Sequence, residues 1–155
     1  MNRMCCWFLL ASLFLTGLAR AQRSTSSMAD QILPLLNEQM LAANAHDTDR
    51  FLATYSHSPE LVFIANGQII RGWDNLREQQ LKWWKDGKSD VVYAQQSQPQ
   101  ITSLDAQTVL VTQQMTSHRT SPDGKPIDAT FIVSTIWQKL PVGWRVTYGH
   151  ESWVR

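Results

Sequence analysis

The second half of the chain contains four long segments rich in Val, Ile, Thr and aromatic residues, and this pattern constrains the fold most strongly. The segments span residues 91–102, 108–119, 127–139 and 144–153. Short turn sequences separate them, for example Ser121-Pro122-Asp123-Gly124, whose residue types are typical of tight turns. Because consecutive strands joined by short turns pair antiparallel, the pattern predicts an antiparallel sheet.

Helical periodicity dominates the beginning of the first half. Ile32, Leu36 and Met40 recur at helical spacing and predict an amphipathic helix over residues 30–45. Pro34 leaves two alternatives open. Either it occupies the first helical turn, where its missing N–H is tolerated, or it kinks a helix that begins near Ser27.

Shorter elements follow this first helix. Asp47 is suited to cap a short helix that carries Phe51 and Leu52. The Asn66-Gly67 pair predicts a tight hairpin between strands at residues 61–64 and 68–71, and residues 73–84 again show helical spacing. Because helices come before the main sheet, we expect an α+β fold with its helices packed on one face of that sheet.

Residues 1–21 have the features of a secretory signal peptide. They combine Arg3 near the start, an apolar run and the small-x-small sequence Ala19-Arg20-Ala21. The apolar run stops short of the roughly 20 residues that a membrane-spanning helix needs. We therefore expect a secreted or periplasmic protein without a stable membrane anchor. Its expected parts are a signal peptide at residues 1–21, a flexible lead-in at 22–29 and a single domain at 30–155.

Removal of this leader changes the charge and the cysteine content of the chain. It takes away Arg3 and Arg20 but no acidic residue, so the formal net charge falls from +1 to −1. Cys5 and Cys6 leave as well, so we expect no disulfide. No basic stripe stands out in the remaining sequence, and a nucleic-acid partner is therefore not expected.

The last predicted strand offers the first candidate site. Side chains alternate across a strand, so Trp144 and Val146 share a face with Tyr148, His150 and Ser152. The apolar members predict that this face points toward the core, which carries the imidazole and the hydroxyl inward. Either these polar groups simply find hydrogen-bond partners in the core, or they line a pocket.

Several ordered motifs resemble the SnoaL-like branch of the nuclear transport factor 2-like superfamily. They comprise residues 44–51, Tyr55, residues 58–63, Gly67, Gly72-Trp73, residues 143–146, His150 and Ser152. The resemblance implies a cone-shaped fold, in which three N-terminal helices pack on a strongly bent antiparallel sheet around a cavity. It also implies a homodimer that forms through the sheet. The superfamily includes ketosteroid isomerase-like enzymes, cyclases and dehydratases as well as binding proteins, so the fold alone does not select a function.

Two main hypotheses follow for this cavity. In the first, an exported protein binds a small apolar or carbonyl-containing molecule. In the second, the same cavity is the active site of an isomerase, dehydratase or hydrolase with His150 as general base. A dimeric scaffold with a vestigial cavity is a third alternative. The candidate ligand-binding residues are Asn44, Tyr55, Trp73, Trp84, Tyr148, His150 and Ser152.

Metals and cofactors are not expected in this site. His46, His57, His118 and His150 are scattered without the spacing of a metal-binding motif, and the chain has no glycine-rich phosphate loop. A catalytic Ser152–His150 pair is also not expected, because residues two apart on a strand project side by side about 6.6 Å apart.

Overall fold

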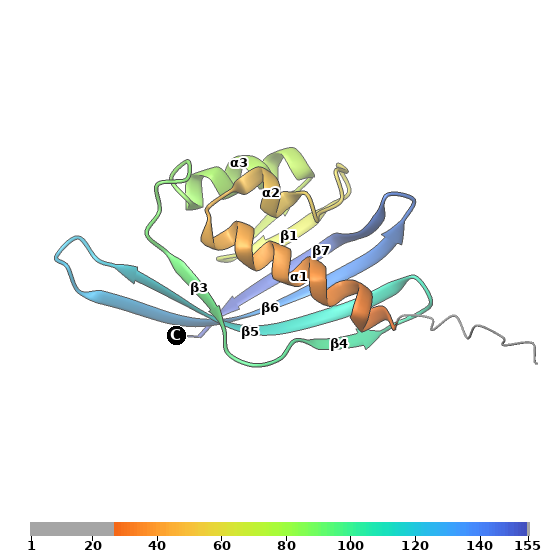
Figure 1. Cartoon of the computed structure of the whole chain (residues 1–155). Coiled ribbons are helices and arrows are strands. Elements are labelled where there is room, and N and C mark those ends of the chain that lie inside the picture. Colours follow the sequence, from red (N-terminus) through yellow and green to blue (C-terminus); the bar gives the residue numbers. More distant parts are fainter. Residues whose placement is uncertain (1–26, 155) are drawn as a thin grey trace, which may run out of the picture.

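A computed structural model describes residues 27–154, in which helices cover one face of a strongly curved sheet. The α+β prediction is therefore confirmed (Figure 1). The helices are α1 (Met28–Asn44), α2 (Thr48–Leu52) and α3 (Trp73–Trp83). The strands are β1 (Val62–Ala65), β2 (Gln68–Arg71), β3 (Val92–Gln95), β4 (Gln100–Ser103), β5 (Thr108–Thr120), β6 (Pro126–Leu140) and β7 (Gly143–Trp153). The predicted signal peptide and most of the predicted lead-in lie outside the described residues.

Side-chain caps fix where the first two helices begin. Ser27 and Asp30 form a reciprocal capping box at the start of α1, which satisfies backbone N–H groups that have no partner within the helix. Pro34 therefore lies inside a continuous helix that begins directly after Ser27, which agrees with the second alternative on where the helix starts. The prediction for Asp47 is also confirmed, since its carboxylate accepts a hydrogen bond from the Arg50 N–H at the start of α2.

The sheet has the strand order β2-β1-β7-β6-β5-β3, and β4 also pairs with β5. The predicted antiparallel pairing is confirmed for β5, β6 and β7, whereas β1 and β7 run parallel. The predicted strand at 91–102 is in fact two strands, because Ser97 and Pro99 lie in an irregular segment between β3 and β4. Proline cannot donate a hydrogen bond to a strand ladder, which explains this break.

A β-bulge in the last strand decides which of its side chains face the helices. Along β6, Trp137 pairs with Val146 while the preceding Ile136 pairs with Tyr148, so Thr147 is an extra residue in β7. An extra residue reverses the alternation of side chains beyond it. Trp144 and Val146 are buried before the bulge, and Gly149 is buried after it.

Two apolar clusters hold the helices against the sheet. The larger cluster includes Ile32 and Leu36 from α1 together with Trp137 and Val146 from the sheet. The smaller cluster joins Ala43, Trp84 and Val91. Between residues 27 and 154, no helix is long and apolar enough to cross a membrane.

Candidate functional site

A cavity of about 890 Å³ lies between the helices and the concave face of the sheet, and its walls come from both apolar clusters. A volume of this order is typical of pockets that hold small organic molecules. Aromatic side chains supply much of its wall. They are Phe51, Tyr55, Phe63, Trp83, Trp84, Tyr93, Phe131 and Trp153.

Glu151 is the titratable group that distinguishes this cavity. It lies on β7 beyond the bulge, pairs in register with Val133 and faces the cavity. Removal from water disfavours the charged carboxylate, so burial raises the pKa of Glu151 to about 7. The indole N–H of Trp153 opposes this increase in pKa, although it does not meet the geometry of a hydrogen bond.

Several hydrogen-bonding groups in the cavity wall have no partner within residues 27–154. The buried indole nitrogen of Trp153 is one of them, and the ring of this residue is held by stacking on Phe131 at 4.4 Å between centroids. The side chains of Gln80 and Gln113 also line the cavity and make no hydrogen bond to another described residue. Unpaired polar groups in an apolar wall are suited to bind polar atoms of an occupant.

Tyr55 contributes a hydroxyl from the loop after α2. The residue is buried, and desolvation together with the nearby charge of Glu151 raises the pKa of its hydroxyl far above the ordinary value. Tyr55 therefore stays protonated and is available as a hydrogen-bond donor. Tyr93 has a raised pKa for the same reason, burial, and its hydroxyl accepts a hydrogen bond from the Trp84 indole N–H at 3.1 Å.

The prediction that His150 faces the interior is wrong. His150 and Ser152 are exposed, and together with Tyr148 they lie on the face of β7 opposite the cavity. The physical reason is the bulge at Thr147, since the sequence argument assumed regular alternation from Trp144 to the end of the strand. Glu151 and Trp153 occupy the inward positions instead.

The structure separates the remaining predicted ligand-binding residues. Tyr55 and Trp84 do line the cavity. Asn44 does not, because its side-chain amide is engaged with the backbone of Tyr93, to which it donates at 3.0 Å and from which it accepts at 2.8 Å. This pair of hydrogen bonds attaches the end of α1 to β3.

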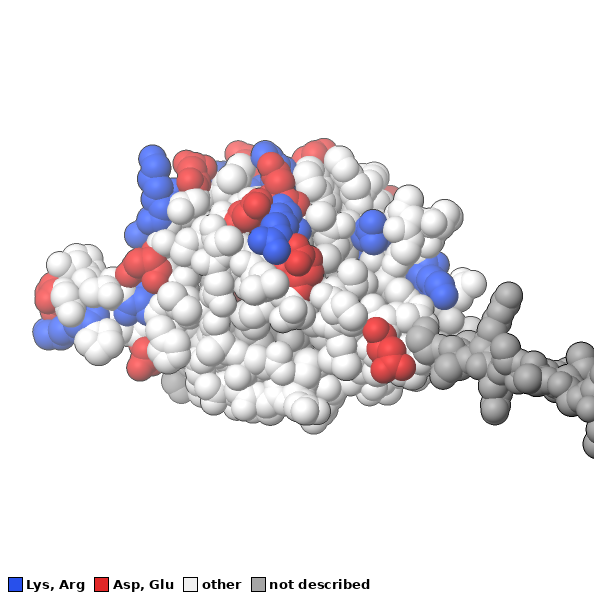
Figure 2. Space-filling view, in the orientation of Figure 1, with Lys and Arg blue, Asp and Glu red and all other residues white. Residues whose placement is uncertain are grey.

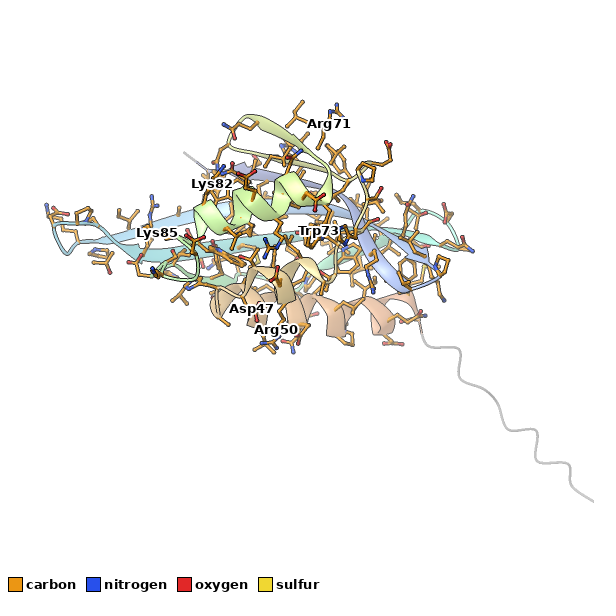
Figure 3. All side chains as sticks on the ribbon, turned by 90° about the horizontal axis from the view of Figure 1, so that it is seen from above. Asp47, Arg50, Arg71, Trp73, Lys82 and Lys85 are labelled. Carbon is orange, nitrogen blue, oxygen red and sulfur yellow. The ribbon has the colours of Figure 1, made fainter. Side chains whose placement is uncertain are left out.

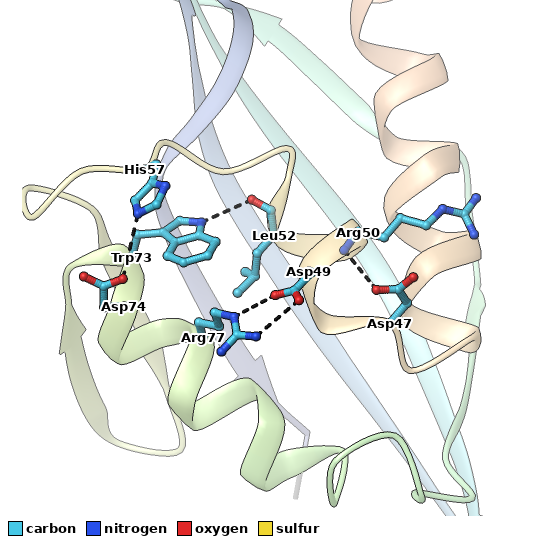
Figure 4. A network of polar contacts seen from close by, with 8 residues as sticks. All are labelled: Asp47, Asp49, Arg50, Leu52, His57, Trp73, Asp74 and Arg77. Atoms are coloured by element: carbon cyan, nitrogen blue, oxygen red, sulfur yellow. Dashed lines mark hydrogen bonds and ion pairs between the residues drawn. The ribbon is translucent and has the colours of Figure 1, made fainter.

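Trp73 has a structural role at the junction of α2 and α3, away from the main cavity. Its indole N–H donates to the Leu52 carbonyl oxygen, and its ring stacks on His57 with 4.1 Å between centroids (Figure 4). Asp49 of α2 and Arg77 of α3 form an ion pair that joins the same two helices. Trp73 therefore contributes to helix packing rather than to the wall of the cavity.

The sequence did contain a signal for Glu151. Trp144, Val146 and Tyr148 are hydrophobic residues at even positions, whereas Trp153, the last aromatic residue of the strand, is at an odd position. Such a change of parity within one strand is typical of a bulge. This change of parity indicates an irregularity in the strand, but the position of the bulge follows only from the pairing of β7 with β6.

No cluster of three or more His, Cys, Asp or Glu side chains arranged to hold a metal ion occurs within residues 27–154.

Comparison with known proteins identifies the family. The sequence profile of the SnoaL-like domain matches residues 32–155, which include all the elements of the cavity. The chain belongs to the SnoaL-like domain family. The resemblance noted from the sequence motifs is thereby confirmed. No curated protein matches the chain.

Solved structures agree with the SnoaL-like fold. A nuclear transport factor 2-like superfamily protein from Salmonella enterica serovar Typhimurium has a TM-score of 0.73 and 22% identity, over 85% of this chain and 94% of that chain. A ketosteroid isomerase-like protein from Erwinia carotovora atroseptica has a TM-score of 0.68 and 18% identity, over 84% of this chain and 98% of that chain. The association domain of a Caenorhabditis elegans kinase, CaMKII, has a TM-score of 0.65 and 16% identity, over 81% of this chain and 95% of that chain. At these identities the SnoaL-like chain shares their fold.

Proposed function

We propose that this SnoaL-like chain binds a small, mostly apolar molecule with a carbonyl or hydroxyl group inside the cavity. The observation that carries the proposal is a hollow of about 890 Å³ with aromatic walls and a buried carboxyl group, Glu151. An unpartnered N–H on Trp153 lies in the same wall. Apolar walls with a few polar groups are the usual composition of a ligand site.

The polar end of the occupant lies at Glu151 in this proposal. When Glu151 is protonated it donates a hydrogen bond, and the Trp153 indole is a second donor, so one carbonyl oxygen can accept from both. The sequence pattern of residues 1–21 further supports action outside the cytoplasm, which we include in the proposal.

Filling the cavity should abolish binding. Ala129 lines the cavity from β6, and an Ala129→Phe substitution would place a ring in the space of the occupant. In isothermal titration calorimetry, the wild-type protein should bind the neutral probe 1-naphthaleneacetamide. The affinity of the variant for this probe should be at least tenfold lower.

Two variants outside the cavity are the controls for this titration. Ala94→Phe adds the same ring to an exposed position of β3, and His150→Ala removes the exposed imidazole. Both should bind the probe with the wild-type affinity. Equal binding by Ala129→Phe and wild type, or no binding by wild type, would contradict the proposed function.

Acid–base catalysis in the same cavity is the second candidate function, and the raised pKa of Glu151 favours it. A carboxyl group with a pKa of about 7 can take up and release a proton near neutral pH. Tyr55 and Trp153 are the donors available to a carbonyl oxygen that gains negative charge. Deuterium exchange at the carbon beside the carbonyl of 2-tetralone, followed by NMR, distinguishes the two candidate functions. If the protein accelerates this exchange and Glu151→Gln abolishes the acceleration, the chain is an enzyme. If the protein binds 2-tetralone without accelerating the exchange, it is a binding protein.

We also propose that the chain forms a homodimer through the outer face of the sheet. The related fold of the kinase association domain supports self-association, and Ile132 at the middle of β6 is 42% exposed on that face. Burial of such apolar side chains drives association. An Ile132→Asp substitution should shift the sedimentation coefficient from dimer to monomer, while Lys125→Asp at the hairpin tip should not. A wild-type monomer at high micromolar concentration would contradict this proposal.

A further inference from the structure

Apart from Asn66 in the β1–β2 turn, the exposed residues of the cavity wall lie on two segments at one end of the molecule. One segment is residues 85–90, between α3 and β3, and the other is residues 119–122, at the free end of the β5–β6 hairpin. Figures 1 and 3 both place the end of α3, marked by Lys85, on the side from which this hairpin projects. These segments therefore form an opening of the cavity to solvent, which we call the mouth.

The mouth carries three cationic side chains that form no ion pair with an acidic side chain of the described residues. Lys85, Lys88 and Arg119 line the cavity, are exposed and make no ion pair with another residue of the described chain. Four other cations of the described chain do have carboxylate partners. These are Arg50, Arg77, Lys82 and Lys125. The cations of the mouth are thus free to bind an anion.

The mouth contains two acidic residues, Asp86 and Asp90, and the carboxylate of Asp90 is already engaged. Its carboxylate accepts a hydrogen bond from the Thr120 N–H at 2.7 Å, which ties the two segments together. That hydrogen bond, with smaller contributions from Lys85 and Arg119, lowers the pKa of Asp90. With three cations and the two carboxylates of Asp86 and Asp90, the mouth has a net charge of +1. In Figure 2, charged side chains of both signs lie over the helices and at the hairpin end, while the lower part of the visible face is largely uncharged.

We infer that the occupant is an amphipathic organic carboxylate, whose anionic group lies at Lys85, Lys88 and Arg119 while its apolar body fills the cavity. This inference rests on the proposed binding function and adds the charge and the orientation of the ligand. The carboxylate stays partly in water at the mouth, so it is not required to lose its hydration completely. The far end of the molecule reaches Glu151 and Trp153.

A cationic ligand attracted by Glu151 is the main alternative. Such a ligand would pass three cations at the mouth, and like charges repel. It would then meet a carboxyl group that burial keeps largely protonated up to about pH 7. Both features favour an anion over a cation.

Three probes of similar size test the charge preference. They are 1-naphthaleneacetate, the neutral 1-naphthaleneacetamide and the cation 1-naphthylmethylammonium, each titrated calorimetrically into the full domain at low salt. Because exposed charges contribute modestly, we expect the acetate to bind about fivefold to tenfold more tightly than the acetamide, and the cation to bind most weakly. Raising the ionic strength to about 0.5 M should reduce the preference, since salt screens exposed charges.

Charge-neutral variants locate the effect. A Lys88→Gln and Arg119→Gln double variant should bind the acetate and the acetamide about equally, because it lacks two of the three cations that attract the carboxylate. Lys139→Gln, at the far end of β6 and outside the cavity wall, is the matched control and should keep the preference. Equal binding of acetate and acetamide by wild type, or tighter binding of the cation, would overturn the inference and leave the proposed function intact. Failure of the acetamide itself to bind would overturn the proposed function instead.

Discussion

Replacing Glu151 with Gln is expected to stabilise the free protein by about 3 kcal/mol at pH 8 and to change its stability little at pH 4. Glutamine has the same shape as the protonated carboxyl group but cannot ionise. The increase in the pKa of Glu151 from its ordinary 4.5 to about 7 corresponds to this energy. The charged carboxylate is thus a destabilising feature that the folded cavity retains.

The direction of the effect follows from proton binding. Between pH 4.5 and about 7, folded Glu151 holds its proton more strongly than unfolded Glu151, so its contribution to stability falls as the pH rises. The protonated carboxyl group makes its full contribution to stability below pH 4.5, and this contribution is lost above about pH 7. Urea unfolding of wild type and Glu151→Gln at pH 4, 6 and 8 measures it directly. The same difference at all three pH values would contradict the prediction.

Glu38→Gln is the matched control on the surface. The Arg50 guanidinium lowers the pKa of Glu38, so this exposed carboxylate contributes its stability above the ordinary pKa rather than below it. The control should therefore lower stability slightly at pH 8, in the opposite direction to Glu151→Gln. If both variants changed the free energy of unfolding at pH 8 in the same direction, the cause would be a general effect of net charge instead of the burial of Glu151.

The features predicted correctly from the sequence depend on neighbouring residues. Asp47 acts as a cap because its side chain reaches the backbone N–H group of Arg50, three residues away. Asn66 and Gly67 adopt the positive φ angles, 52° and 76°, that the hairpin turn between β1 and β2 requires. Each of these structures is determined within a few residues, so the sequence alone was sufficient to identify them.

The site was predicted poorly because it depends on distant parts of the chain. The direction of Glu151 is set by the bulge at Thr147, and the bulge is defined only by the register of β7 against β6. Likewise, the engagement of Asn44 by Tyr93 joins residues 49 positions apart. An alternation rule applied to a single strand contains neither kind of information, so it placed His150 on the wrong face.

Gly149 should be the least replaceable glycine of the sheet. It pairs with Phe63 across the parallel β1–β7 ladder, and the Phe63 ring covers the space where a side chain would lie. A Cβ atom at this position would be 2.5 Å and 2.6 Å from two carbon atoms of that ring. Both distances are well inside van der Waals contact, so the ring, which forms part of the cavity wall, would have to move.

Gly149→Ala is therefore expected to reduce the free energy of unfolding by about 2 kcal/mol, as overpacked cores do. Phe63→Leu in the same chain should remove the clash, so the double variant should be more stable than the sum of the two single losses predicts. Gly124→Ala is the control, because a Cβ atom there has nothing within 4 Å. Any stability that this variant loses comes only from the strain of an alanine at the positive φ of 81°. Urea unfolding of the four variants measures the coupling, and strict additivity between positions 63 and 149 would show that the ring does not occupy the space above Gly149.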